Sequence, residues 1–181
     1  MLRFAAILAG AGIACVAQGQ TPAAGTTMPS AAPCAQPEAH QFDFWIGEWT
    51  VTKPDGTPAG SSRIEAILDG CVVLEHWTSA TPPYAGKSLN LYNRNSGQWE
   101  QFWVDNTGSR LHLVGGIEDG RMVLRGSQDA ADPKTGVTQR ERIAWTRQDD
   151  GGVRQLWETS TDGGASWKVS FDGRYRRAKH E

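Results

Sequence analysis

The sequence lacks an excess of either charge. Its 181 residues carry 20 acidic and 18 basic side chains, a formal net charge of −2, and no basic stripe marks any segment. Nucleic-acid-binding domains usually show such a stripe, so we expect no nucleic-acid partner. Long helical patterns are missing as well, because no helical run exceeds about two turns.

Signatures of metal and nucleophile chemistry are also absent. The four histidines are scattered at positions 40, 76, 112 and 180, and no Cys/His cluster has the spacing of a zinc site. There is no Gly-x-Ser-x-Gly elbow. Residues 85–88 (AGKS) end like a P-loop, but Thr81 stands where its leading glycine belongs. We therefore expect no metal and no cofactor.

The apolar run at the N-terminus is too short to cross a bilayer. Arg3 precedes the stretch 4–17 (FAAILAGAGIACVA), which has the length of the apolar core of an export signal. We expect a signal peptide over 1–19, no membrane span, and a periplasmic or secreted protein. Residues 12–15 partly resemble a bacterial lipobox, so a lipid anchor at Cys15 is the alternative to ordinary cleavage.

Only three cysteines occur in the chain. Loss of the signal would leave Cys34 and Cys71, and an even pair in an oxidising compartment predicts a disulfide. Two free thiols are the alternative. Residues 20–37 are rich in Ala, Pro and Thr and carry no charge, which indicates a flexible linker. The folded domain is then 38–181.

Asp-Gly pairs punctuate that domain at regular intervals, and such pairs favour tight hairpin turns because both central residues adopt positive φ. Short runs rich in Val, Leu, Trp, Thr and Arg lie between them, and the one expected helix is short, at 38–46. We predict an all-β, antiparallel up-and-down meander of about ten strands closed as a barrel. The expected strands are 47–53, 61–68, 71–78, 87–93, 98–105, 110–117, 121–127, 137–147, 153–160 and 166–177.

Pairing neighbouring strands through their turns separates two faces. The expected pairs include Asn90 with Gln101, Phe102 with Leu113, and Ile117 with Met122. One face is polar and aromatic: Ser88, Asn90, Tyr92, Trp99, Gln101, Trp103, His112 and Arg125. The other is aliphatic: Leu89, Leu91, Phe102, Val104, Leu111, Leu113, Ile117, Met122 and Leu124.

Two further groups follow from the remaining turns. The turn at 69–70 places on one face Ile64, Ala66, Leu68, Val73, Glu75 and Trp77. The turns at 150–151 and 162–163 place on one face Arg142, Thr146, Gln155, Trp157, Trp167 and Phe171.

Polar side chains in these groups lie mid-strand beside tryptophans. Unpaired in an interior they would cost several kcal/mol, so they must pair with one another, with water or with a ligand. One interpretation is a structural Glu75–Arg142 pair, with the amides bonded among themselves. We favour the other, a cavity in which Trp rings stack on a ligand and polar groups orient it. The predicted ligand-binding residues are Glu75, Trp77, Asn90, Gln101, Trp103, Arg142, Gln155 and Trp157.

The stretch 42–49 (FDFWIGEW) resembles the opening of lipocalins, where a short helix leads into Gly-x-Trp on the first strand. The resemblance implies that Trp49 plugs the base of the barrel and that Arg174, Arg176 or Arg177 packs across it. Residues 40–177 are similar to a family of exported bacterial proteins of lipocalin-like (calycin) type, which implies a fold but brings no activity. The resemblance rests on FDFWIGEWTV, ILDGCVVLEHW, GKSLNLYN, QWEQFWVD, GGIEDGRMVLRG, RIAWT and VRQLWETSTDGGASWKVSFDGRY.

Residues 160–167 (STDGGASW) match the Asp-box hairpin, S-x-D-x-G-x-x-W. In that hairpin Asp162 bonds turn amides and Trp167 packs under the loop. We interpret this motif as structural.

The leading hypothesis is an exported lipocalin-like barrel that binds a small, partly polar ligand, and a binding role is favoured over an enzymatic one. One alternative is an enzyme with Glu75 as acid or base and Arg142 holding an anion. Another is an envelope interaction protein without a ligand. The last is a heme-binding barrel using His76 or His112, although 47–51 (GEWTV) departs from the Gly-x-Trp-x-Gly-x-Gly opening of such barrels.

Overall fold

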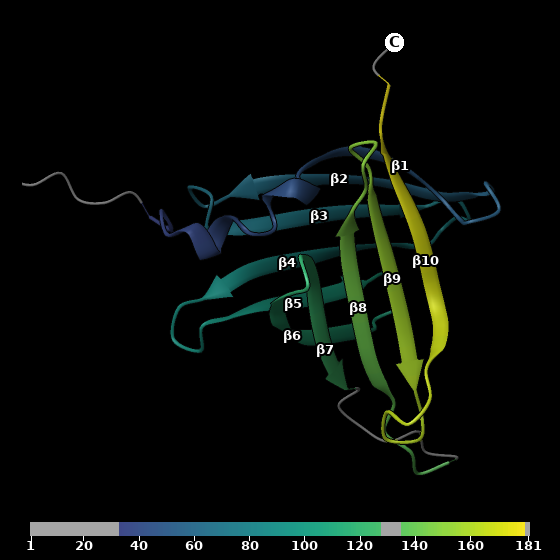
Figure 1. Ribbon diagram of the computed structural model, residues 1–181. Helices are drawn as coiled ribbons and strands as arrows, with labels where there is room; N and C mark the ends of the chain where they lie inside the picture. The colour runs from purple at the N-terminus through teal and green to yellow at the C-terminus, as the bar shows by residue number, and fades with distance from the viewer. Residues whose placement is uncertain (1–32, 128–134, 180–181) are drawn as a thin grey trace, which may run out of the picture. The chain divides into compact units, whose positions relative to one another are not determined.

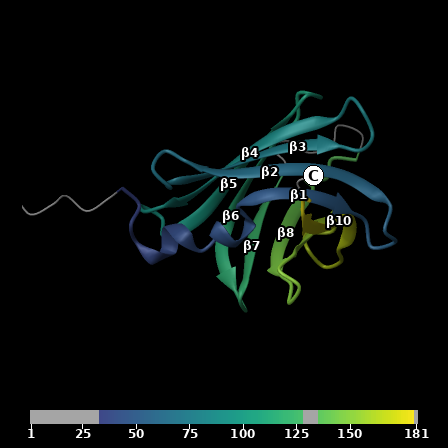
Figure 2. The ribbon, with the colours of Figure 1, turned by 90° about the horizontal axis from the view of Figure 1, so that it is seen from above.

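A computed structural model describes residues 33–127 and 135–179. This part of the chain forms a closed antiparallel barrel in which each strand pairs with its neighbour in sequence and β1 pairs with β10 (Figures 1 and 2). The predicted all-β meander of ten strands is therefore confirmed. The strands are β1 (Gly47–Thr52), β2 (Pro58–Ile67), β3 (Val72–Ser79), β4 (Ala85–Asn93), β5 (Gln98–Asp105), β6 (Arg110–Glu118), β7 (Arg121–Ser127), β8 (Arg140–Arg147), β9 (Val153–Ser160) and β10 (Lys168–Arg177).

The short helix predicted at 38–46 is present as two short 3-10 helices, η1 (Pro37–His40) and η2 (Asp43–Trp45). They lie at the end of the barrel where β1 begins (Figure 1). The predicted disulfide is confirmed, because Cys34 is bonded to Cys71 and so ties the segment before η1 to the turn between β2 and β3. The expected signal peptide over 1–19, including Cys15, and the expected linker up to residue 32 lie outside the described residues.

Aromatic rings fill the end of the barrel next to η1 and η2. Phe42 stacks on Trp45 and contacts Trp99 and Trp145 edge-on, with ring centroids 5.0 to 5.6 Å apart. We call this end, with Phe42, Trp45, Trp49, Trp99 and Trp145, the closed end; all five side chains are buried. Such ring pairs add about 0.5–1.5 kcal/mol each beyond the burial of their area.

Trp49 and Arg177 adopt the arrangement that the lipocalin resemblance implies. The Arg177 guanidinium lies 4.0 Å from the Trp49 ring centroid and donates a hydrogen bond of 2.7 Å to the Ile46 carbonyl. A Cβ at Gly47 would lie 1.7 Å from Arg177 Nη1, and Gly47 has φ of +142°. Glycine is thus required beside Trp49 because the arginine crosses the chain there.

The register is partly as predicted. Asn90 faces Gln101 and Ile117 faces Met122, as expected. Phe102, however, faces His112 instead of Leu113. The β5–β6 loop has three residues, closed by the Ser109 carbonyl on the Asp105 amide at 3.2 Å, with Gly108 at φ +84°. A three-residue loop ending in a left-handed glycine replaces the two-residue turn expected at Thr107-Gly108, and the register moves by one.

The β8–β9 hairpin shows the same difference. Its loop is closed by the Gly152 carbonyl on the Gln148 amide at 2.9 Å, and Gly151 has φ of +76°. Trp145 therefore faces Gln155, where Thr146 was expected. A one-residue slip turns every side chain of a strand to the other face of the sheet.

Each slip changes which predicted residues are inside. On β4 and β5 the polar-aromatic set points inward, and its aliphatic counterparts Leu89, Phe102 and Val104 are 44%, 42% and 54% exposed. On β6 and β7 the opposite holds, because Leu113, Met122 and Leu124 are buried and His112 and Arg125 are exposed. The interior thus mixes residues of the two predicted faces.

Four members of the group predicted around the turn at 69–70 lie inside the barrel: Ile64, Val73, Glu75 and Trp77. Ala66 and Leu68 are exposed instead. Leu68 already belongs to the turn, with φ of +51°, so its side chain leaves the strand face.

The Asp-box hairpin joins β9 to β10. Asp162 accepts hydrogen bonds from the Ser166 amide at 2.9 Å and from the Ser160 hydroxyl at 2.7 Å. The Ser166 side chain and amide, together with the Ser160 hydroxyl, hold the pKa of Asp162 well below its ordinary value. Trp167 donates to the Gly164 carbonyl at 3.1 Å, which pins its ring under the loop.

Candidate functional site

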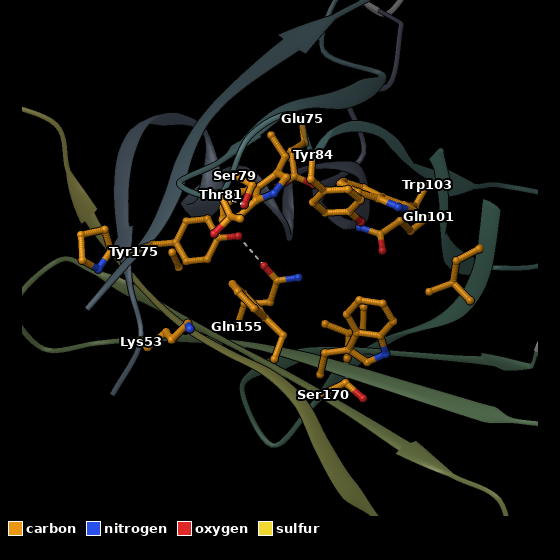
Figure 3. Close-up of a pocket in the computed structure, with 17 residues that line it drawn as sticks. Lys53, Glu75, Ser79, Thr81, Tyr84, Gln101, Trp103, Gln155, Ser170 and Tyr175 are labelled. Carbon is orange, nitrogen blue, oxygen red and sulfur yellow. Dashed lines mark hydrogen bonds between the residues drawn. The ribbon is translucent and has the colours of Figure 1, made fainter. Parts of the chain in front are cut away.

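A cavity of about 360 Å³ occupies the other half of the barrel, and its size is within the range of small-molecule sites. Lys53 and Thr81, which follow β1 and β3, lie at its rim (Figure 3). We call the half of the barrel that holds it the cavity end. Because β1 begins at the closed end and runs toward Lys53, the cavity opens away from the aromatic plug.

Four aromatic side chains from separate strands make the walls of the cavity. Trp77 meets Phe171 edge to face, with centroids 5.8 Å apart, and Trp103 and Trp157 also line it. A Cβ at Gly86 would lie 2.3 Å from Trp103 Cζ2, so glycine on β4 lets that ring lie flat against the sheet. Trp157 is fixed by a 2.6 Å hydrogen bond from its Nε1 to the buried Glu141 carboxylate.

Glu75 lies in the same lining and is the acceptor of a chain of hydrogen bonds. Its carboxylate accepts from the Ser62 hydroxyl at 3.1 Å and from the Ser88 hydroxyl at 2.9 Å. Ser88 in turn accepts from Asn90 Nδ2 at 3.0 Å, and Asn90 Oδ1 accepts from Gln101 Nε2 at 2.8 Å. We call these five side chains, on β2 to β5, the Glu75 network.

The electrostatics of Glu75 are set by burial without charge compensation. The side chain is 3% exposed, and no cation among the described residues forms an ion pair with it. Burial raises the pKa of Glu75 from its ordinary 4.5 to about 7, although the Ser88 and Ser62 hydroxyls oppose the shift. The carboxyl group therefore changes its charge near neutral pH.

Tyr175 and Gln155 form a second polar pair in the cavity. The Tyr175 hydroxyl donates to Gln155 Oε1, which leaves the Gln155 amide nitrogen as the donor facing the cavity (Figure 3). Burial raises the pKa of Tyr175 well above its ordinary value, and the negative charge of Glu75 adds to the rise. The cavity thus offers an acidic acceptor on one wall and an amide donor on another.

The structure brings most of the predicted ligand-binding residues together. Those that line the cavity are Glu75, Trp77, Gln101, Trp103, Gln155 and Trp157. Asn90 lies behind Gln101 and supports it through the hydrogen bond described above. The expected bonding of the amides among themselves is therefore present, but it surrounds a cavity instead of filling it.

Arg142 is the predicted site residue that lies elsewhere. It donates to the Glu158 carboxylate at 2.8 and 3.1 Å, and its guanidinium lies 4.3 Å from the Trp167 ring centroid. The expected Glu75–Arg142 pair is wrong, because the extra residue in the β8–β9 loop shifts the register by one and turns Arg142 to the outer face. Arg142 therefore does not hold an anion beside Glu75, as the enzymatic alternative expected.

His76 and His112 do not meet in the barrel. His76 bonds to Glu65 at 2.9 Å, and His112 bonds to Glu100 at 3.0 Å while its ring stacks on Phe102. Both occupy strand positions that alternate with inward-facing neighbours, so neither lines the cavity. The described histidines therefore give a heme in this cavity no axial ligand.

Two tyrosines of the cavity lining and two side chains that support it from behind were not identified from the sequence. Tyr84 lies in the connection between β3 and β4, where the alternation of faces could not be followed, and Tyr175 lies beyond the bulge of β10. Ser62 could have been found, since it is two residues before Ile64 and faces Trp77 across the sheet. Glu141 could not have been found in this way, because the register expected for β8 placed its side chain on the outer face, whereas it is buried.

Comparison with models of known protein families finds no match, and no curated protein matches the sequence. Within 33–127 and 135–179, no cluster of three His, Cys, Asp or Glu side chains could hold a metal ion. None of the helices described is long and apolar enough to span a membrane. The site's own geometry therefore carries the functional inference.

Proposed function

We propose that the protein is an exported lipocalin-like barrel that binds a small, partly polar ligand in the cavity walled by Trp77, Trp103 and Trp157. One observation carries this proposal. The cavity combines aromatic walls with the Glu75 network, whose buried carboxylate has no cationic partner among the described residues. Aromatic area supplies affinity, and a few convergent polar groups supply orientation.

The contrast with the rest of the interior supports a binding role. A barrel that serves only as a scaffold is most stable when side chains fill it, as they do at the closed end. Here the buried Glu75 carboxylate borders open volume instead, and a buried charge is costly unless an opposite charge compensates it. A ligand that pairs with this carboxylate is the simplest reason for an interior of this kind.

Two other observations support the lipocalin-like family and the exported location. The packing of Arg177 across Trp49 next to Gly47 is the arrangement the resemblance implies. The Cys34–Cys71 disulfide is of the kind that persists in oxidising compartments. Detection of the mature protein in periplasmic or culture fractions of the native cell would test the location directly.

The binding function is tested by ligand screening with a blocked-cavity variant. A library of metabolites and lipids is titrated while intrinsic tryptophan fluorescence is recorded, and the wild type should respond to at least one compound. Ala59→Phe places a ring in the cavity, so that response should disappear. Val104→Phe enlarges an outward side chain to a similar degree and should respond like the wild type. Equal responses in both variants would contradict binding in the cavity.

Catalysis with Glu75 as a general acid or base is a second candidate, favoured by its raised pKa and its place in the cavity. If an assay panel detects a reaction, Glu75→Gln should abolish turnover while ligand binding persists. An unchanged rate in that variant would remove Glu75 from the chemistry.

A further inference from the structure

Charge is distributed unevenly along the cavity. Among the described residues of the lining, the only acidic side chain is Glu75 and the only basic one is Lys53 at the rim. Figure 3 shows Glu75 and Lys53 on different sides of the open space. A bound ligand therefore meets negative charge at one place inside the barrel and positive charge at the rim.

The hydrogen bonds fix Glu75 as an acceptor. Asn90 Nδ2 and Gln101 Nε2 are amide nitrogens that can only donate, so the Ser88 oxygen accepts from Asn90 and its proton is directed to Glu75. Ser62 is the second hydroxyl within reach. A carboxylate has about four acceptor positions, and two remain for a ligand donor.

The carbonyl of Gln101 and the aromatic walls both favour a cationic ligand group beside Glu75. Gln101 uses its amide nitrogen within the Glu75 network, and its carbonyl oxygen points into the cavity (Figure 3). Rings of Trp77 and Trp103 stand in the same lining as Glu75. Cations bind over the faces of such rings, most strongly where water is excluded.

We propose that the ligand is a small organic amine whose ammonium group donates to the Glu75 carboxylate and the Gln101 carbonyl, with its hydrocarbon part between the tryptophan rings. The inference rests on the proposed binding function and names the ligand class. An ammonium group supplies the positive charge that compensates the buried Glu75 carboxylate. Its N–H donors also match the acceptor oxygens of Glu75 and Gln101. Lys53 disfavours the opposite orientation, with the ammonium at the rim.

Affinity for an amine should depend on pH through Glu75. The titratable groups that face Glu75 are Tyr175 on β10 and Tyr84 before β4, and Lys53 lies at the rim. Burial and the charge of Asp105 raise the pKa of Tyr84 to about 12, so both tyrosines stay neutral near pH 7. The ionised form of Glu75 binds the amine, and its population falls about tenfold between pH 8 and pH 6 when the pKa is near 7.

The test uses matched probes that differ in charge. Isothermal titration compares phenethylamine, phenethyl alcohol and hydrocinnamate, and then hexylamine, hexanol and hexanoate, on the full protein. At about pH 8 each amine should bind at least about tenfold more tightly than its alcohol, and the acid more weakly than both. Amine affinity should fall about tenfold on going to about pH 6, while alcohol affinity does not fall.

Variants separate Glu75 from the general charge of the protein. Glu75→Gln should lose at least about tenfold in amine affinity and keep its affinity for the alcohol. Glu65→Gln removes an exposed carboxylate from the neighbouring strand β2 and should bind like the wild type. The pH dependence of the wild type provides the same information without any substitution.

The outcomes distinguish the two proposals. Alcohols or acids that bind as tightly as the amines would overturn the amine inference and leave the cavity as a binding site. Amine binding that is unchanged by Glu75→Gln and by pH would also overturn it. Failure of all six probes to bind the wild type would instead contradict the proposed binding function.

Discussion

The two ends of the barrel use the same kind of residue for different purposes. At the closed end, Phe42 packs against Trp45, Trp99 and Trp145. Trp49 is held there by the hydrogen bond from its Nε1 to the Trp45 carbonyl, and all four tryptophans are at most 1% exposed. At the cavity end, Trp77, Trp103 and Trp157 face open volume beside Glu75. Tryptophans therefore form a filled core at one end of the barrel and the walls of a cavity at the other. The difference depends on which other side chains pack between them.

The difference arises from the N-terminal turns. η1 and η2 deliver Phe42 and Trp45 into the closed end, and Trp99 is anchored there by a hydrogen bond of 3.1 Å to the Glu38 carbonyl. At the other end, no described helix covers the mouth, and two loops carry Lys53 and Thr81 to its rim. The barrel is thus capped on one side by its own chain and open to a ligand on the other.

The largest expected effect is the loss of the plug. Trp49→Ala removes a buried ring from contact with Tyr175 and Arg177 and should lower the free energy of unfolding by about 3–5 kcal/mol. Trp103→Ala removes a half-buried ring that already borders empty volume and should cost about 1–2 kcal/mol. Urea unfolding followed by circular dichroism measures both. Equal losses would mean that the ends do not differ in packing.

The disulfide should contribute nearly as much, because it holds the turns that form the plug. Replacing both Cys34 and Cys71 by Ser should reduce the free energy of unfolding by about 3–4 kcal/mol, as expected for a loop of this length. The wild type treated with a reductant is the matched control and should unfold like the double variant. A reductant that changes nothing in the wild type would show that the bridge does not stabilise the fold.

Glu75 should make the cavity end sensitive to pH. Since burial raises its pKa from 4.5 to about 7, the folded state binds more protons than the unfolded state between these pH values. Glu75 should therefore lower the free energy of unfolding by about 3 kcal/mol as pH rises through this window. Glu75→Gln should match the wild type near pH 5 and exceed it near pH 8.

Urea unfolding of the wild type, Glu75→Gln and Glu65→Gln near pH 5 and pH 8 measures the contribution of Glu75. It is the change with pH in the difference between the free energies of unfolding of wild type and variant. Glu65→Gln should follow the wild type, because the pKa of Glu65 is lowered, chiefly by its hydrogen bond with His76. A Glu75→Gln variant that is less stable than the wild type at the higher pH would show that the carboxylate is compensated in the free protein.

The smallest effect is expected at Arg142. Arg142→Gln breaks a partly buried ion pair with Glu158 and a contact with Trp167, so the free energy of unfolding should fall by about 1 kcal/mol. Ligand affinity should not change, because the side chain lies outside the cavity. A loss of affinity in this variant, measured with any compound that binds the wild type, would show that the outer face takes part in binding.

The sequence predicts the fold well because its turns are local signals. Asp-Gly pairs and alternating runs located all ten strands, and the Asn90–Gln101 register placed the amides of the Glu75 network inside. The lipocalin resemblance at Gly47-x-Trp49 implied a plug crossed by one of three arginines, and Arg177 is the one in contact with Trp49. Each of these features is decided within a few residues or by one hairpin.

The side of the sheet that a residue faces was harder to predict. Gly108 and Gly151 end three-residue loops, and one extra loop residue moved Arg142 and His112 from the predicted interior to the surface. Thr107-Gly108 and Asp150-Gly151 are each compatible with loops of both lengths, so the turn sequence does not decide between them. Tyr84 and Tyr175 were missed because a long connection and a bulge interrupt the alternation.

The most direct test of the hollow, uncompensated cavity end is the titration of Glu75 itself. Carbon-detected NMR of protein labelled at glutamate carboxyl groups, with Glu75→Gln for assignment, gives its pKa with and without saturating phenethylamine. We predict a pKa near 7 in the free protein and a value lowered well below that when the amine is bound. A free-protein pKa near 4.5, or one that saturating amine leaves unchanged, would contradict the uncompensated carboxylate and its ammonium partner.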